Sequence, residues 1–312
     1  MTTVDTMTVL VLASRLGDRS RPSLAPGAWH RLVAQLGDVG MTPDDLLGRS
    51  LPEWPSIDDE LALRLEQLIE GSGAVAFEYE ELSRKGVGAI GIGDDAYPSR
   101  LTRLLGSAAP PVLFSVGEPS LLSRGGVAVV GSRNVEPEGG DVAQAIARQA
   151  VALGIPVVSG GARGVDQLAM NAAFNAGGEV VGVLADSLLQ RIRKPDILRA
   201  LDSGNICLIT QQHPETGFSA AAAMARNKIV YALSDLTVVI ASDEDTGGTW
   251  AGAVEALGRG YGKVAVWRGR GEGPGNAALA AKGAAPFDNV TGLGELLASE
   301  QDTDPEQLSI LE

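Results

Sequence analysis

The stretch Val127-Ala128-Val129-Val130-Gly131-Ser132-Arg133-Asn134 decides the fold of this chain. Four apolar residues form a short buried strand that runs directly into a glycine, a hydroxyl and an arginine. In an open parallel sheet, ligands bind beyond the carboxyl ends of the strands. Gly131 permits a tight turn there, and Arg133 offers forked hydrogen bonds to a phosphate. The stretch indicates an anion site, although a solvated arginine on a strand-ending turn explains it equally well.

A second junction of the same kind occupies residues 158–166, which read Val-Ser-Gly-Gly-Ala-Arg-Gly-Val-Asp. Its glycines permit close approach by a ligand, and the helix expected behind it offers free N–H groups and a positive dipole end. Arg163 adds a full charge, and we interpret Asp166 as a cap of that helix. Two such junctions in one domain favour phosphate binding over coincidence. Together they contribute Gly131, Ser132, Arg133, Ser159, Gly160, Gly161, Arg163 and Gly164 to the candidate site.

A third candidate segment, Arg226-Asn227-Lys228, lies in an expected helix. Side chains two residues apart diverge on a helix, so Arg226 and Lys228 both reach one anion only near a helix start or a bend. A solvated helix face is the plain alternative for this segment.

The fourth segment, Gly247-Gly248-Thr249, follows an expected strand. Consecutive glycines with flanking threonines are typical of a backbone nest that binds an anion at a helix start. An ordinary strand–helix loop explains the same residues. Glu255 follows in the helix, and a chemical role for it stays open.

Short runs rich in valine and isoleucine alternate with helical stretches through the middle of the chain. We expect strands at residues 127–130, 157–159, 180–184, 208–210, 236–240 and 264–267, and helices at 140–153, 166–176, 195–202, 220–233 and 251–259. This alternation predicts right-handed crossovers. The fold class is therefore α/β, with an extended Rossmann-like parallel sheet that carries helices on both faces.

Four parts are expected along the chain. Residues 1–73 form a small helical N-terminal domain with helices near 28–36, 42–47 and 58–69, and residues 74–126 lead into the main fold. That lead-in holds a helix, a strand at 88–92 and a connection over 94–117. Residues 127–268 form the Rossmann-like domain. Residues 269–312 comprise a mobile glycine-rich loop to 280, a strand–helix piece over 286–298 and a flexible acidic end from 300.

The net charge of −14 argues against a general nucleic-acid binder, but the charge is unevenly spread. Residues 1–120 and 271–312 each carry −7, whereas residues 121–270 are neutral, so a local basic cleft is compatible with the middle domain. One cysteine and two histidines exclude a disulfide framework and favour neither a metal site nor an oxidising compartment. No apolar run of membrane-spanning length or signal peptide is recognisable, so we expect a cytoplasmic protein.

Catalytic patterns are lacking in the sequence. No G-x-x-x-x-G-K-[ST] phosphate loop and no G-x-S-x-G nucleophile motif occurs, and the two histidines give no Ser/His/Asp arrangement. We therefore name no catalytic residue, no cofactor and no metal. The chain is interpreted as a binding protein rather than an enzyme.

Taken together, the segments resemble the DNA-processing protein A (DprA/Smf) family. Val130-Gly131-Ser132-Arg133, the glycine-rich stretch 158–166 and Arg226-Asn227-Lys228-Ile229 match its motifs in order, with an upstream stretch over 97–117. The resemblance implies single-stranded DNA as the ligand, a RecA-type recombinase as a partner, and a homodimer. It further implies that Arg133, Arg163, Arg226 and Lys228 contact phosphates, while Gly131, Ser132, Ser159, Gly160 and Gly161 shape the pocket.

This chain departs from the family at several positions. Gly161 stands where the family has leucine, Met170 lies near the place of a histidine, and Lys228 replaces an arginine. The stretch 247–250, with Glu255, is similar to LOG-type nucleotide phosphoribohydrolases. We expect a single-stranded DNA binder acting in DNA uptake, recombination or defence. A nucleotide sensor or hydrolase of the LOG type is the alternative, and a scaffold whose pocket has lost its ligand is a third possibility.

Overall fold

The computed structural model describes residues 4–21, 23–48 and 57–299, and within these nine strands form one sheet. The strand order is β1-β2-β6-β5-β4-β3-β7-β8-β9. The strands are β1 Gly88–Gly91, β2 Val112–Gly117, β3 Val127–Val130, β4 Val157–Ser159, β5 Val180–Val183, β6 Ile206–Thr210, β7 Leu236–Val239, β8 Lys263–Trp267 and β9 Ala285–Phe287. From β6 to β9 all neighbours are parallel, so the predicted Rossmann-like α/β fold is confirmed.

The antiparallel edge of the sheet was not predicted. β2 pairs antiparallel with both β1 and β6, and the expected connection over residues 94–117 is wrong, because it contains helix α5 (Ser99–Leu105) as well as β2. Two prolines, Pro110 and Pro111, precede β2 and indicate a turn. Nearly every residue of β2 is buried, as in the predicted strands β5 and β7, but Ser115 interrupts its apolar run.

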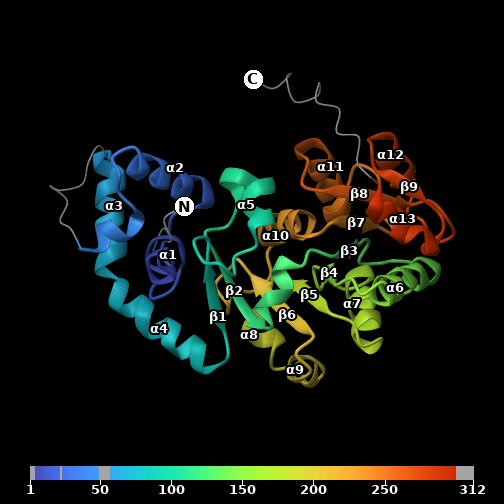
Figure 1. The fold of residues 1–312 in the computed structure, drawn as a ribbon, viewed down its shortest axis with the longest axis horizontal. Helices are drawn as coiled ribbons and strands as arrows, with labels where there is room; N and C mark the ends of the chain where they lie inside the picture. The colour runs from blue at the N-terminus through green and yellow to red at the C-terminus, as the bar shows by residue number, and fades with distance from the viewer. Residues whose placement is uncertain (1–3, 22, 49–56, 300–312) are drawn as a thin grey trace.

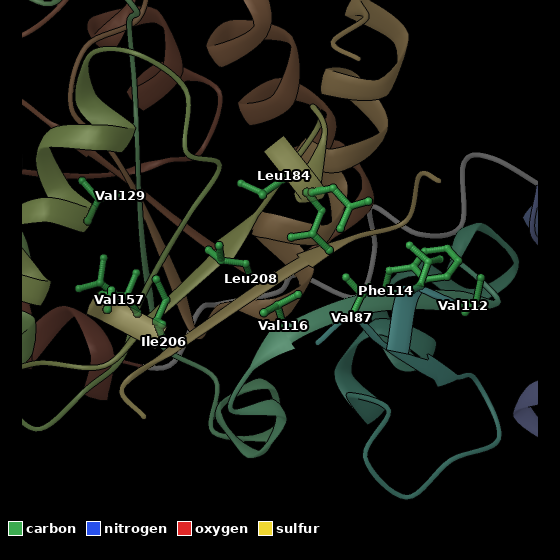
Figure 2. Packing of buried hydrophobic residues seen from close by; sticks show 14 of the residues in the cluster. Val87, Val112, Phe114, Val116, Val129, Val157, Leu184, Ile206 and Leu208 are labelled. Atoms are coloured by element: carbon green, nitrogen blue, oxygen red, sulfur yellow. The ribbon is translucent and has the colours of Figure 1, made fainter. Parts of the chain in front are cut away.

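The sheet is buried on both faces, and alternate residues of each strand enter different cores. In β3, Val127 and Val129 join one core while Ala128 joins the other. Helices α6 and α7 cover the first face, and α5, α10 and α11 cover the second (Figure 1). Figure 2 shows the first core continuing from Val129 to Phe114 of the antiparallel edge.

The helices of the main fold agree with the sequence in most places. They are α6 Pro137–Ala152, α7 Val165–Asn175, α8 Leu188–Arg191, α9 Pro195–Asp202, α10 Ala220–Leu233, α11 Gly247–Arg259, α12 Asn276–Ala281 and α13 Leu293–Ala298, with 3-10 turns η3 Gly106–Ala108, η4 Pro119–Ser123 and η5 Val290–Gly292. α9 and α10 begin and end where predicted, and β9 with α13 confirms the strand–helix piece. α8 was not predicted.

Two predictions near the carboxyl end need correction. α11 begins at Gly247 rather than at residue 251, so the two glycines belong to its first turn. The expected loop over 269–280 is wrong from Asn276 onward, where α12 begins. The buried Asn276 amide donates to Ile240 O and Trp267 O, both at 2.8 Å, which anchors this segment to two strand ends. The acidic end, residues 300–312, lies outside the described residues.

The N-terminal helices lie together beside the antiparallel edge of the sheet (Figure 1). They are α1 Thr6–Ala13, α2 Pro26–Gly37, the 3-10 helix η1 Pro43–Gly48, α3 Asp59–Glu70 and α4 Ser72–Arg84. The helix expected near 42–47 is therefore a 3-10 helix. The division of the chain into domains stays a prediction, and the proposed boundary after residue 73 falls within α4. No helix in the described part of the chain is long and apolar enough to span a membrane.

Candidate functional site

The candidate site lies where the strand order reverses. β3 has β4 on one side and β7 on the other, so the loops that follow β3 and β7 diverge and leave a crevice at the carboxyl edge. A hollow of about 430 Å³ occupies this crevice, and a second of about 320 Å³ adjoins it. We call the two hollows the site groove. They share a wall made of Arg133, Gly160, Ala162, Phe218 and Arg226.

Arg226 is the buried cation of the groove. Its Nη1 donates to Val183 O at 3.2 Å and lies 3.6 Å from Asp166 Oδ2. Burial raises the pKa of the Asp166 carboxyl, and the Arg226 guanidinium and backbone N–H groups oppose that shift. Burial lowers the pKa of Arg226, but a guanidinium stays protonated in proteins. The pair places a fixed positive group in the groove wall, largely balanced by its carboxylate.

Asp166 is not the helix cap that we expected. The N-cap of α7 is Gly164, at a φ of 87°, and Asp166 lies in the first turn. Its carboxylate accepts from the Ala162 N–H at 3.4 Å. The N–H groups of Val165 and Gln167 donate to Ser132 O and Ala162 O, so most of the α7 start is already hydrogen-bonded. The second junction therefore contributes mainly its arginine and its glycines.

Arg133 and Arg163 are the exposed cations of the groove. No ion pair engages either of them among the described residues. Arg163 Nη2 donates to Asn134 Oδ1 at 2.6 Å, which links the two glycine–arginine junctions. The Arg133 guanidinium lies 5.0 Å from the centre of the Phe218 ring. These two guanidinium groups have charge available for an anionic ligand.

The start of α11 forms another wall of the larger hollow and carries backbone N–H groups without a side-chain cap. The Thr246 side chain makes no capping hydrogen bond, and Gly247, Gly248 and Thr249 all line the larger hollow. The first N–H groups of a helix have no partner within it and favour an anion. Asn227 Nδ2 donates to Gly248 O at 3.1 Å and thereby ties this turn to α10.

Most of the predicted site residues meet in the groove, but three do not. Ser159 is fully buried, and its hydroxyl donates to Val129 O at 2.8 Å. Gly164 lies behind the groove, where a Cβ would stand 2.4 Å from Ser132 O. Lys228 points away from Arg226, as expected on a helix, and its Nζ lies 2.8 Å from Glu255 Oε1. Neither Lys228 nor Glu255 lines the groove.

Sequence reasoning missed several groove residues. Phe218 is 56% exposed, so the scarcity of aromatic residues did not exclude an aromatic at the site. Arg191 donates to Gly161 O at 3.3 Å and to Asp186 Oδ2 at 2.7 Å. The Tyr231 hydroxyl is buried beside the larger hollow and has no hydrogen-bond partner among the described residues. The sequence could have indicated Tyr231, because it lies in the same expected helix as Arg226.

Comparison with protein families places this chain among known relatives. The model of the family described as DNA recombination-mediator protein A matches residues 88–297, which is more than half of the chain. This chain belongs to that family. The DNA processing protein DprA of Bacillus subtilis (strain 168) is 30% identical over 186 residues, which cover 59% of this chain and 61% of that protein.

Solved structures give the same fold. DNA processing protein A from Streptococcus pneumoniae matches with a TM-score of 0.74 and 20% identity, covering 94% of this chain and 99% of that one. A Helicobacter pylori structure, described as giving insight into a single-stranded DNA binding mode of DNA processing protein A, matches with a TM-score of 0.57 and 24% identity. That match covers 68% of this chain and 95% of the other. At these identities the likeness concerns the fold alone.

Proposed function

We propose that this family member binds single-stranded DNA along the site groove without acting as an enzyme. The observation that carries the proposal is the pair of cations along the groove that no ion pair engages in the described part of the chain. Arg133 lies in the shared wall beside the exposed ring of Phe218, and Arg163 lines the adjoining smaller hollow. Free cations attract the phosphate backbone, and an aromatic ring stacks on bases of any sequence. The Helicobacter pylori relative is described by its single-stranded DNA binding mode, which supports the same ligand here.

The shape of the groove favours a strand over a single anion. Two adjoining hollows with a common wall offer room for successive nucleotides, and cationic groups occur in both. Arg133 lies in the common wall, Arg163 lines the smaller hollow, and the start of α11 lines the larger hollow. We propose that Arg133, Arg163 and the α11 N–H groups contact phosphates, with Arg226 held behind them.

The test replaces the two free cations together. Arg133→Ala with Arg163→Ala should weaken binding of a fluorescent oligothymidylate by about tenfold or more, because two charge-assisted contacts are lost. The salt dependence should also flatten, by about 1.4 in the slope of log K against log salt, since two fewer counterions are released from a single strand. Anisotropy titrations at several salt concentrations measure both quantities.

A matched control keeps the same change in net charge. Arg103 and Arg148 are exposed, lie outside the groove and form no ion pair among the described residues, so their double alanine variant removes two charges elsewhere. That variant should bind within about twofold of the unchanged protein, since long-range steering is weak under salt screening. Equal losses in both double variants would reject the groove as the DNA site.

A free nucleotide remains the second candidate ligand. The observation in its favour is the Tyr231 hydroxyl, an unused donor beside a hollow whose opposite wall offers helix N–H groups. Thermal-shift assays with nucleoside monophosphates, followed by chromatography for released base, distinguish a sensor or a LOG-type hydrolase from a DNA binder. A thermal shift without base release would indicate a sensor, and absence of both effects would reject a free nucleotide as the ligand.

The biological setting belongs to the same proposal. Membership of the family supports a role in DNA uptake or recombination, a RecA-type recombinase as partner, a homodimer and a cytoplasmic location. Co-sedimentation with a RecA-type filament and light scattering of the purified protein test the two partners directly.

A further inference from the structure

The loop that joins β6 to α10, residues 211–219, contacts both the site groove and the N-terminal helices. Near its end, Phe218 forms part of the common wall of the groove and stacks on Arg133. Near its start, the His213 side chain is 1% exposed and lies against α4. One short loop therefore connects a buried contact in the helical layer to an exposed contact in the groove.

The His213 ring is hydrogen-bonded on both of its nitrogen atoms. The Glu215 N–H donates to His213 Nδ1 at 3.2 Å, so the ring hydrogen resides on Nε2, which donates to Glu78 Oε1 at 2.9 Å. The second oxygen of Glu78 accepts from the Gly17 N–H at 2.6 Å. A single carboxylate of α4 thus joins the loop after α1 to the loop before α10.

Other contacts on this loop are weaker or lie on its opposite side. Arg19 pairs with Glu215, but their side chains are 56% and 44% exposed, so water and salt screen the pair. On the side of α8, the Leu189 N–H and the Ser187 hydroxyl both donate to Pro214 O at 3.1 Å. The bond between His213 and Glu78, whose side chains are 1% and 27% exposed, is therefore the less screened charge-assisted contact that fixes the loop to the helical layer.

We propose that Glu78 and His213 are positioning residues of the groove, holding the loop so that Phe218 stacks on Arg133. Neither residue lines the groove, so their effect on a ligand passes through the loop. The N-terminal helices thereby set the affinity of the groove for single-stranded DNA. This inference rests on the proposed function for its binding measurement.

The first experiment compares Glu78→Ala with Glu81→Ala. Glu81 lies on the same helix, is exposed and has no hydrogen bond or ion pair among the described residues. Affinity for an oligothymidylate should fall about fivefold in Glu78→Ala and less than about twofold in Glu81→Ala, because only the first releases the loop. Glu78→Gln keeps one acceptor oxygen and should recover part of the loss.

A double-mutant cycle separates positioning from a general structural role. Glu78→Ala is repeated in a Phe218→Ala background, where the residue that the loop positions has been removed. The further loss should then be less than about twofold, since the two sites act through one contact. The same fivefold loss in both backgrounds, or no loss in the unchanged background, would overturn the proposal.

A measurement without DNA keeps this inference separate from the proposed function. Hydrogen exchange of the backbone N–H groups over residues 211–219 should be faster in Glu78→Ala than in Glu81→Ala. If the unchanged protein binds no oligonucleotide, the proposed function fails, and the exchange experiment still tests the contact. Unchanged exchange in Glu78→Ala would show that Glu78 does not hold the loop.

Discussion

Gly160 is the residue that allows a buried arginine to reach the groove. A Cβ at this position would stand 1.1 Å from Arg226 Nη1, so no side chain fits while Arg226 keeps its place. The contact explains the first of the three glycines in the second junction by steric exclusion. The next, Gly161, has a φ of 63°, a conformation that glycine adopts without cost.

Gly160→Ala should therefore destabilise the protein. A displaced Arg226 leaves the buried Asp166 without its cation, and breaking such a pair costs about 3 kcal/mol of unfolding free energy. Urea unfolding followed by circular dichroism measures the change. Gly258→Ala is the matched control, because nothing lies within 4 Å of a Cβ there and the position is helical. The control should gain about 0.5–1 kcal/mol from helix propensity, and a comparable gain in Gly160→Ala would contradict the steric argument.

Among the helices, α11 is the one whose start is left open toward the groove. α10 begins with Ser219, whose hydroxyl accepts from the Ala222 N–H at 3.0 Å, whereas Thr246 makes no such bond at the start of α11. A capped helix start has satisfied one of its free donors, and an uncapped one has them available for a ligand. The difference is consistent with a phosphate at α11 and none at α10.

Thr246→Asp should separate stability from binding. An aspartate at the N-cap satisfies a free N–H group and interacts favourably with the helix dipole, so unfolding free energy should rise by about 1 kcal/mol. The same carboxylate occupies the phosphate position and should weaken oligothymidylate binding by about tenfold. Thr246→Asn caps without a charge, so it should stabilise somewhat less than the aspartate and cause a smaller loss of affinity. Equal affinity in all three proteins would place the strand elsewhere.

The helices and strands that the sequence predicted correctly are those whose ends are marked by nearby residues. α9 and α10 were placed correctly because Pro195 and Ser219 mark their starts. The predicted start of α11 was too late, because two consecutive glycines, Gly247 and Gly248, are more typical of a turn than of the first turn of a helix. β2 was missed because two prolines precede it and Ser115 interrupts its apolar run.

The groove could be predicted only in part, because some of its residues are placed by tertiary contacts rather than by local sequence. The glycine–arginine junctions follow strands, and the shared edge of a parallel sheet brings them together. Phe218 and Arg191 come from a loop and a short helix whose positions depend on tertiary contacts such as that of His213. Ser159 was assigned to the site, but its hydroxyl bonds Val129 O within the sheet.

For the molecule as a whole, the negative net charge opposes the attraction of the groove cations for DNA at long range. A net charge of −14 repels DNA until the strand comes within a screening length of Arg133 and Arg163. On the proposed function, the groove would therefore capture DNA by short-range contacts rather than by steering. This balance explains how an acidic chain is compatible with a nucleic-acid ligand.

The ionisation of the single cysteine reports whether the centre of the sheet stays closed to water. Cys207 is fully buried in β6, between the antiparallel edge and the parallel strands, and burial raises the pKa of its thiol to about 12. In the unfolded chain the thiol ionises near pH 8.5, as free cysteines do. Because the folded pKa is the higher one, the contribution to stability is complete below about pH 8.5 and is lost as the pH rises toward 12.

The unfolding free energy should thus fall with alkaline pH by an amount that belongs to Cys207. One proton is involved, so the loss approaches about 1.4 kcal/mol for each pH unit above 8.5. Cys207→Ala lacks this term, and its other groups titrate as in the unchanged protein. Urea unfolding under reducing conditions should show the stability difference between the two proteins shrinking by about 2 kcal/mol from pH 7.5 to pH 10. A constant difference would mean that the thiol ionises as readily within the sheet as in the unfolded chain, and the centre of the sheet would then admit water.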